Sequence, residues 1–449
     1  MLNFEVDIFA REIIKPSSPQ IKGMKPFKLT FFDQLTPATN VTNILFYSIS
    51  GTSFTPAVIL HQLKTSLSET LNILYPFAGR IKDNMFIDSF DEGVPFVSAQ
   101  AGCRLSEFLK HHEVKSLNKL LPCPPFSKEL KNEVVPLLCQ ATIFACGGIA
   151  IGFGGSHKLI DGQTYFNLCN VWRTICRGSH YRDVGFHGLA EGSKVFPPLN
   201  EVPENYLSTM ENLWFQGSHN YITKRFTFDA KSITELRAIA KGELEATPSR
   251  VQALSGFIWK HFMAATRTMS ASSKPSIAVQ AVNLRPRMNL PLLHKSIGNL
   301  FWFASCAADI ADETSTELFE LVKLMRESVE AFDDEYLNSL QGEQGFEATG
   351  DLINQLETLF SHEKPDMLAF SSWCDLRLYE FDFGWGKPQW VAPFGEVASD
   401  FRNLIVFLPT KCGKGIEAWT TLDERRMFLL EKDAEFLKFA SPTPRFSSL

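Results

Sequence analysis

The sequence predicts an α/β protein of two domains, each with a mixed β-sheet flanked by helices. Its 449 residues exceed the usual size of one domain and leave ample surface to bury. Strand-like and helix-like segments occur in both halves, with a similar content in each. Between the halves, residues 183–222 have little hydrophobic periodicity. We therefore expect an N-terminal domain at 1–182, a crossover linker at 183–222 and a C-terminal domain at 223–449.

In the first half, a helix is expected from Thr55, because this hydroxyl N-cap and Pro56 precede leucines spaced three or four residues apart. A second helix with an apolar stripe is expected at 162–177. Period-two patterns and short apolar runs predict strands at 4–14, 41–48, 85–88, 95–98, 137–144 and 149–153. The last two strands form a hairpin, because two glycines lie between them.

In the second half, the same rules predict a second set of strands and helices. Helices are expected from about 231 and at 249–268, 314–332, 349–361 and 424–438. Strands are expected at 224–229, 276–285, 367–372, 377–380, 403–408 and 415–421. Each half therefore has enough strands for a sheet of its own.

The composition excludes several classes of protein. A content of 45% hydrophobic and 21% charged residues is typical of a folded globular chain. The net charge of −6 offers no basic surface for nucleic acid or an anionic membrane. Nine scattered cysteines without a CxxC pair, and no secretory leader, favour free thiols in the cytoplasm. The longest weakly polar run, 134–155, contains Pro136 and a glycine pair, so no membrane span is expected.

The segment FGGSHKLIDGQ, residues 153–163, places His157 four residues before Asp161. On a continuous helix the two side chains would share a face and could pair. The glycines instead indicate a strand-to-helix turn, which makes Asp161 a helix N-cap whose carboxylate points to backbone N–H groups. A charged Asp161 in a core would then need an arginine. His157 is left as the candidate reactive residue, with a purely structural histidine as the alternative.

The motifs that are missing narrow the chemistry open to His157. No HxxxH or HExxH pattern occurs, so no metal is expected, and no GxSxG nucleophile motif is present. A histidine acting alone as a general base needs an activated electrophile such as a thioester. The DFG at 382–384 lacks the other kinase motifs, so we interpret YEFDFGWGKPQW (379–390) as a tight structural loop.

Together, SHKLIDG and DFGWGKP resemble the HxxxD and DFGWG motifs of the plant BAHD acyltransferases, in the order and at the separation typical of that family. The opening EIIKPSSP and the run SSWCDLRLYEFDFGWGKP are most similar to the branch that acetylates indole alkaloids. The resemblance extends over essentially the whole chain, through FKLTFFDQL (27–35), YPFAGRIKDN (75–84), VNLRPRMNLP (282–291), GNL (298–300) and FSSWCDLRLYEFDFGWG (370–386).

The resemblance implies two chloramphenicol-acetyltransferase-like domains with a channel between them. It also implies acyl transfer from an acyl-CoA co-substrate to an alcohol, with no bound cofactor. His157 would lie in the channel, remove the hydroxyl proton during attack on the thioester, and return that proton to the leaving thiolate. Because both substrates are bound together, the attack is effectively intramolecular and needs no acyl-enzyme.

Further site residues follow from their positions in the family. The indole N–H of Trp373 is expected to bind the oxyanion with help from the Ser371 hydroxyl, with core packing as the alternative for Trp373. Asp161 is expected to pair with Arg285. The loop on the CoA side is expected to be shaped, without chemistry, by the DFGWG residues Asp382, Gly384, Trp385 and Gly386.

The resemblance also suggests contacts to the donor. Ser249, Arg250 and Ser255 lie near the start of a long helix, where hydroxyls and N–H groups suit the CoA phosphates; a plain N-cap is the alternative for Ser249. Arg425 and Arg426 lie in the first turn of the last helix, where positive charge opposes the helix dipole. One of them is a candidate to bind a malonyl carboxylate, the alternative being a surface ion pair.

The expected function is transfer of an acetyl group from acetyl-CoA to a hydroxyl of a plant specialised metabolite, an indole alkaloid by resemblance, by a cytoplasmic monomer. The 39 phenylalanines favour an aromatic channel, in which a protonated amine would gain cation–π contact. Leu159 and Ile160 are bulkier than the corresponding residues of many relatives, which points to a different acceptor shape. The alternatives are malonyl transfer to the same acceptors, amide formation, and a non-catalytic ligand-binding protein.

Overall fold

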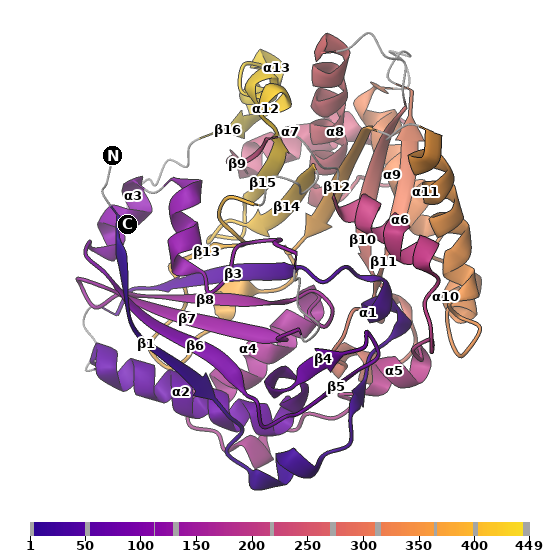
Figure 1. Cartoon of the computed structure of the whole chain (residues 1–449). Coiled ribbons are helices and arrows are strands. Elements are labelled where there is room, and N and C mark those ends of the chain that lie inside the picture. The colour runs from indigo at the N-terminus through magenta and orange to yellow at the C-terminus, as the bar shows by residue number, and fades with distance from the viewer. Residues whose placement is uncertain are drawn as a thin grey trace.

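The computed structural model describes residues 4–49, 54–111, 113–128, 134–215, 220–269, 275–309, 316–362, 366–397 and 403–442. The chain forms two large sheets with helices packed on them and one small sheet (Figure 1). The predicted α/β class, with two mixed sheets flanked by helices, is confirmed.

The first sheet has the strand order β1-β6-β7-β8-β3-β13. Only β6 and β7 run parallel; the other neighbours are antiparallel. Helices α2 (Pro56–Ile73) and α4 (Gly162–Cys176) pack together beside this sheet, and both begin where the sequence predicts. The strands are β1 (Val6–Ile14), β3 (Asn40–Tyr47), β6 (Val94–Ala101), β7 (Leu137–Phe144), β8 (Ile149–Ser156) and β13 (Trp390–Ala392).

Strand β13 belongs to the second half of the sequence but completes the first sheet. Its residues Trp390, Val391 and Ala392 pair antiparallel with β3. The last strand of the first sheet therefore comes from within the predicted 223–449 segment. The division of the chain at 182 and 223 stays a prediction.

The second sheet has the strand order β11-β10-β12-β14-β15-β9-β16, with β10, β12 and β14 parallel to one another. Alternate residues point to opposite faces, as the pleat requires. One face, with Ala278, Leu368 and Ile405, packs on helices, and the other turns Val279 and Val406 toward the first sheet. The strands are β9 (Tyr221–Phe228), β10 (Ser276–Asn283), β11 (Phe301–Ala308), β12 (Asp366–Ser372), β14 (Leu404–Pro409), β15 (Ile416–Asp423) and β16 (Ala440–Ser441).

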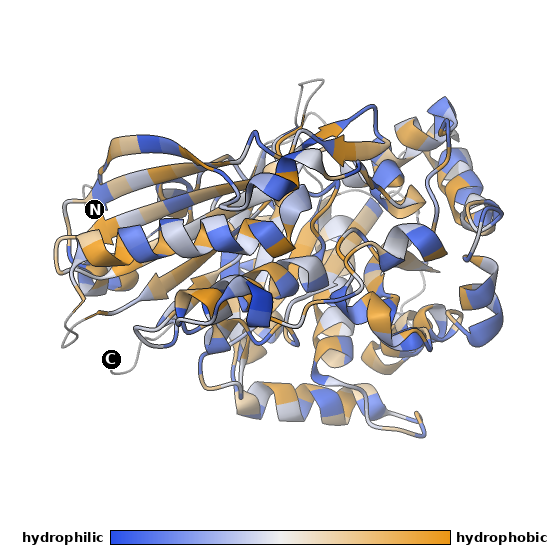
Figure 2. Cartoon of the chain, turned by 90° about the horizontal axis from the view of Figure 1, so that it is seen from below, coloured by the Kyte–Doolittle hydropathy of each residue, from blue (hydrophilic) through white to orange (hydrophobic). Residues whose placement is uncertain are grey.

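Helices cover the outer face of this second sheet and connect the remaining segments. Those in contact with its core are α7 (Ala230–Lys241), α8 (Arg250–Met269), α9 (Leu318–Glu330), α12 (Glu424–Leu430) and α13 (Ala434–Phe439). The others are α1 (Phe31–Leu35), α3 (Leu105–His111), α5 (Glu191–Val195), α6 (Glu204–Trp214), α10 (Asp334–Ser339) and α11 (Gly350–His362). Coloured by hydropathy, the helices carry both hydrophobic and hydrophilic residues along their length (Figure 2).

The small sheet and several 3₁₀ turns complete the fold. The sheet consists of β2 (Phe27–Lys28), β5 (Phe86–Asp88) and β4 (Arg80–Lys82). The turns are η1 (Pro19–Gly23), η2 (Tyr75–Ala78), η3 (Val114–Leu120), η4 (Tyr181–Asp183), η5 (Arg285–Arg287), η6 (Pro291–Lys295), η8 (Glu347–Thr349) and η9 (Leu378–Glu380).

Three segments differ from the sequence prediction. The predicted linker 183–222 is not irregular throughout, because it contains α5, α6 and the start of β9, and α6 packs on α11. The strand expected at 377–380 is the turn η9, which follows Arg377 at φ 46°. The helix expected at 424–438 is divided, because Asp433 caps a new helix with its side chain.

Within the described ranges, no helix is long and apolar enough to cross a lipid bilayer.

Candidate active site

A cavity of about 210 Å³ lies between the two sheets, and His157 forms part of its wall. The first sheet and the turn after it contribute Thr42, Asn43, Phe153, Gly155 and His157. Strands β10, β11, β12 and β14 form the opposite wall, and the end of α6 adds Leu213 and Trp214. Most of the wall is apolar or aromatic, which is typical of a small-molecule site.

The turn that carries His157 is fixed by backbone contacts. The His157 N–H donates to the Thr39 carbonyl at 2.7 Å, which ties the turn to the start of β3. A Cβ at Gly155 would lie 2.5 Å from both the Pro136 carbonyl oxygen and the Ile160 side chain. Only glycine allows this approach, so the glycines before the histidine set the course of the chain.

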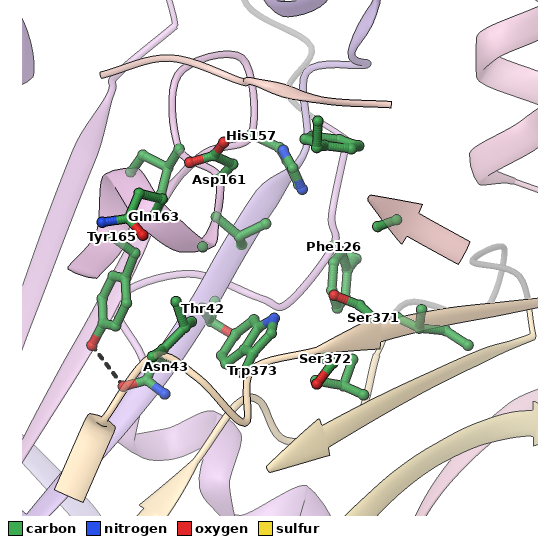
Figure 3. Close-up of a pocket in the computed structure, with 18 of the residues that line it drawn as sticks. Thr42, Asn43, Phe126, His157, Asp161, Gln163, Tyr165, Ser371, Ser372 and Trp373 are labelled. Atoms are coloured by element: carbon green, nitrogen blue, oxygen red, sulfur yellow. Dashed lines mark hydrogen bonds between the residues drawn. The ribbon is translucent and has the colours of Figure 1, made fainter. Parts of the chain in front are cut away.

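Asn299 determines which ring nitrogen of His157 carries the hydrogen. The Asn299 Nδ2 donates to the His157 carbonyl at 2.5 Å and to Asp33 Oδ1 at 2.9 Å. These two acceptors fix the amide orientation and turn its Oδ1 toward His157 Nδ1, 3.2 Å away. Since Oδ1 can only accept, Nδ1 carries the hydrogen. The lone pair of His157 therefore lies on Nε2, and the ring points into the cavity (Figure 3).

The environment keeps this histidine uncharged at neutral pH. Burial lowers the pKa of His157 below its ordinary 6.5, although Asp161 and Asn299 act in the opposite direction. Two aromatic rings enclose the imidazole, with the centroid of Trp214 at 4.8 Å and that of Phe301 at 5.7 Å. A neutral, partly enclosed imidazole is suited to accept a proton.

Asp33 is fully buried and accepts four hydrogen bonds from Thr30 and Asn299. Burial raises its pKa to about 6, against the effect of those hydrogen bonds. Asp33 is therefore charged at neutral pH and holds the amide of Asn299 in place.

Asp161 faces away from His157 and lies against Arg285. Its Oδ1 accepts from the Thr164 N–H at 2.8 Å, as an N-cap does, and its Oδ2 accepts from Leu300 N at 3.0 Å and Arg285 Nη1 at 2.5 Å. Burial would raise the pKa of Asp161, but the Arg285 charge and these hydrogen bonds hold it below its ordinary value. Arg285 is itself fully buried and also donates to the Leu293, Ser296 and Gly298 carbonyls.

Trp373 and Ser371 lie on the wall formed by the second sheet. Ser371 belongs to β12, and Trp373 directly follows this strand. The backbone N–H of Trp373 donates to the Phe407 carbonyl at 2.8 Å. His157 and Trp373 come from different sheets and line the same cavity (Figure 3). The structure thus brings together the three residues for which the sequence suggested chemistry.

The DFGWG residues do not line the described cavity. Asp382 Oδ1 accepts from the N–H groups of Gly384 and Gly386, at 2.8 and 3.0 Å, and both glycines have φ above 110°. Arg177 at the end of α4 pairs with Asp382 at 3.0 Å. Trp385 packs edge-on against Tyr47 of β3. The loop therefore fixes the segment that leads to β13 on the first sheet. This packing does not indicate a contact between the DFGWG residues and CoA.

Ser249, Arg250 and Ser255 lie at the start of α8 and outside the cavity wall. Ser249 is the N-cap: its N–H donates to Gln252 Oε1 and its Oγ accepts from Gln252 N. Arg250 donates to the Gly413 carbonyl at 2.8 Å. The Ser255 hydroxyl is buried and has no hydrogen-bond partner among the described residues. A phosphate contact for these residues stays a prediction.

The two arginines of α12, Arg425 and Arg426, are not at the described cavity wall. Arg426 pairs with Asp366 and Asp423, each at 2.6 Å, and Arg425 is exposed on α12. Both carboxylates can reach Arg426, because Asp423 ends β15 as the N-cap of α12 and Asp366 begins β12. The geometry gives no support to a malonyl contact through either arginine.

The sequence reasoning missed three residues of this site. Asn299 and Asp33 lay within the GNL and FKLTFFDQL segments, which were noted only for their resemblance. Trp214 lay inside the supposed irregular linker. Its signal in the sequence was the apolar run Leu213, Trp214 and Phe215 at the end of α6.

The whole chain is covered by one family. Residues 4–437 match the model of the Transferase family, and the chain belongs to this family of BAHD acyltransferases. Its members use an acyl-CoA as co-substrate.

Named relatives cover nearly the full length. The chain is 36% identical to akuammiline synthase 2 of Alstonia scholaris, over 98% of this chain and 97% of that protein. It is 35% identical to a limonoid 7-O-acetyltransferase of Citrus sinensis, over 98% and 99%. Its structure is similar to the crystal structure of vinorine synthase, from Rauvolfia serpentina, with a TM-score of 0.81 and 32% identity over 98% and 99% of the two chains.

Proposed function

We propose that the protein transfers an acetyl group from acetyl-CoA to a hydroxyl of a polycyclic plant metabolite, with an indole alkaloid as the acceptor class. The observation that carries this proposal is His157 itself. Its Nδ1–H is engaged by Asn299, and its Nε2 faces an apolar cavity between the two sheets. Named relatives among alkaloid and limonoid enzymes support an alcohol acceptor.

In the proposed mechanism, His157 Nε2 takes the hydroxyl proton as the acceptor oxygen attacks the thioester carbonyl. The tetrahedral oxyanion receives hydrogen bonds from the Trp373 indole N–H and the Ser371 hydroxyl. Collapse breaks the carbon–sulfur bond and releases the CoA thiolate, which takes the proton from His157. Asn299 keeps Nδ1 protonated throughout, so Nε2 alone exchanges the proton.

Acetyl is the donor group favoured by the cavity. A malonyl group would bring a free carboxylate, which needs a cation or several donors. No lysine or arginine is among the described cavity residues, and Arg426 is already paired. Malonyl transfer is therefore the second candidate, and we expect a clear preference for acetyl-CoA.

The acceptor class rests on the relatives and on the shape of the wall. The relatives include both alkaloid and limonoid enzymes, so the acceptor panel must include both kinds of alcohol. The nine cysteines carry no disulfide among the described residues, and we propose a monomeric cytoplasmic enzyme. Size-exclusion chromatography with light scattering measures the oligomeric state.

The test is release of CoA thiol from acetyl-CoA or malonyl-CoA with that panel, followed by mass spectrometry of the products. His157→Ala is expected to abolish turnover while the melting temperature stays near that of the parent. His61→Ala, an exposed histidine on α2, is the matched control and should keep full activity. Parent-like turnover by His157→Ala would refute the assignment of the base. If no alcohol of the panel leads to CoA release from either donor, the proposed function is refuted.

A further inference from the structure

The described residues of the cavity wall provide no available counter-charge for a cation. Among its described residues, Asp161 is the only carboxylate, and no glutamate lines the wall. Both Asp161 oxygens already accept hydrogen bonds, and its charge is matched by Arg285 at 2.5 Å. This carboxylate is therefore committed to the fold and cannot also pair with a ligand.

Three other polar side chains of the wall are also engaged. Tyr165 donates its hydroxyl hydrogen to Asn43 Oδ1 at 2.7 Å, and Asn43 Nδ2 donates to the Ala392 carbonyl at 3.1 Å (Figure 3). The Thr42 hydroxyl donates to the Pro393 carbonyl at 3.1 Å. These bonds tie the side chains to β13 and its flank, so these three side chains offer an ammonium group little replacement for water.

The role of His157 Nε2 as the base disfavours a cation in a second way, because a cation interferes with proton transfer. An ammonium N–H in the cavity would compete with the substrate hydroxyl for this lone pair. The transferred proton also turns His157 into an imidazolium, and a second positive charge nearby would oppose that step. Cation–π contact with Trp214 or Phe301 offsets only part of the desolvation of an ammonium.

We infer that the acceptor binds in its uncharged form, so that an alcohol that also carries an amine is used as the free base. This inference rests on the proposed function and specifies its substrate. It reverses the expectation from the sequence that a protonated amine is favoured by the aromatic wall. The ligand recognised is a neutral polycyclic alcohol.

The test uses three acceptors with one ring skeleton and one hydroxyl. The first carries a tertiary amine, the second its N-methyl quaternary salt, and the third a carbon in place of the nitrogen. Values of kcat/KM are measured by CoA release across neutral and mildly alkaline pH. The ratio of the amine to the carbon analogue cancels the titration of His157, because both acceptors use the same base.

We expect this ratio to rise about tenfold per pH unit below the pKa of the amine and then to level off. The quaternary salt should be at least about 100-fold poorer than the carbon analogue at every pH. A ratio that does not change with pH, or a quaternary salt used as well as the carbon analogue, would overturn the inference. If none of the three acceptors leads to CoA release, the proposed function is contradicted, and the inference fails with it.

A variant of the wall provides a second test. Ala281 of β10 lines the cavity and is exposed, so a larger side chain fits there without disturbing a core. Ala281→Asp introduces a carboxylate, and Ala281→Asn is its uncharged match. The Asp variant should raise the activity ratio of quaternary salt to carbon analogue by at least about tenfold relative to the Asn variant. Equal ratios in the two variants would mean that charge does not govern acceptor choice.

Discussion

Removal of Asp161 should cost stability rather than a step of chemistry. Asp161→Ala deletes the N-cap of α4, which is worth about 1 kcal/mol, and leaves a buried arginine without its partner, which costs about 3–5 kcal/mol. Arg285 keeps acceptors at 2.9, 3.1 and 3.3 Å from the Gly298, Leu293 and Ser296 carbonyls. We therefore expect a total near the lower end, about 4 kcal/mol.

The measurement is the urea midpoint and melting temperature of Asp161→Ala beside Asp161→Asn, which keeps an N-capping oxygen but loses the charge. The Asn variant should lose less stability. Adding Arg285→Met to Asp161→Ala should recover part of the loss, because no unpaired charge is then buried. If Asp161→Ala melts like the parent but does not turn over, Asp161 takes part in the chemistry and our reasoning is wrong.

Because burial lowers the pKa of His157, kcat/KM should stay constant as pH falls through 6.5 and decrease only below it. A decrease of kcat/KM that is already centred at or above pH 6.5 would contradict this assignment. Asn299→Leu removes the acceptor for Nδ1–H, so kcat should fall about 10- to 100-fold while the KM for acetyl-CoA is unchanged, and a loss confined to KM would argue against a role in orienting the base. Ser249→Ala should raise the KM for acetyl-CoA if the hydroxyl binds phosphate; a loss of about 1 kcal/mol in stability with an unchanged KM would identify a plain N-cap.

Local patterns predicted most elements of the fold because their causes are local. Thr55 with Pro56, and the leucine stripe behind them, are sufficient to define α2, and Asp161 does the same for α4. The strand β13 escaped prediction because three residues carry no period, and its pairing with β3 depends on a partner more than 300 positions away in the chain. Residues 377–380 failed for a similar reason, because the left-handed Arg377 turns the chain where the pattern suggested extension.

A residue of the site was predictable only where a reactive side chain lay in a distinctive local sequence. His157 could be selected because glycines precede it and a helix follows it. Asn299 and Asp33 are ordinary polar residues in the sequence, and their importance appears only when folding places them 2.9 Å apart beside the imidazole. For the arginines of α12, the ion pair given as the alternative to a malonyl contact is present between Arg426 and Asp423, whereas the second partner, Asp366, could not be predicted because it is 60 positions away.

The crossing of β13 onto the first sheet also has a consequence for biosynthesis. Until residue 392 has left the ribosome, the outer edge of β3 exposes unpaired N–H and C=O groups, in a strand with the buried run Ile44 to Tyr47. A nascent or truncated chain that ends before β13 therefore presents an open, apolar strand edge, which is a template for aggregation. We expect the first 182 residues alone to be recovered from cells mainly as insoluble protein, and the native first sheet to close only at the end of translation.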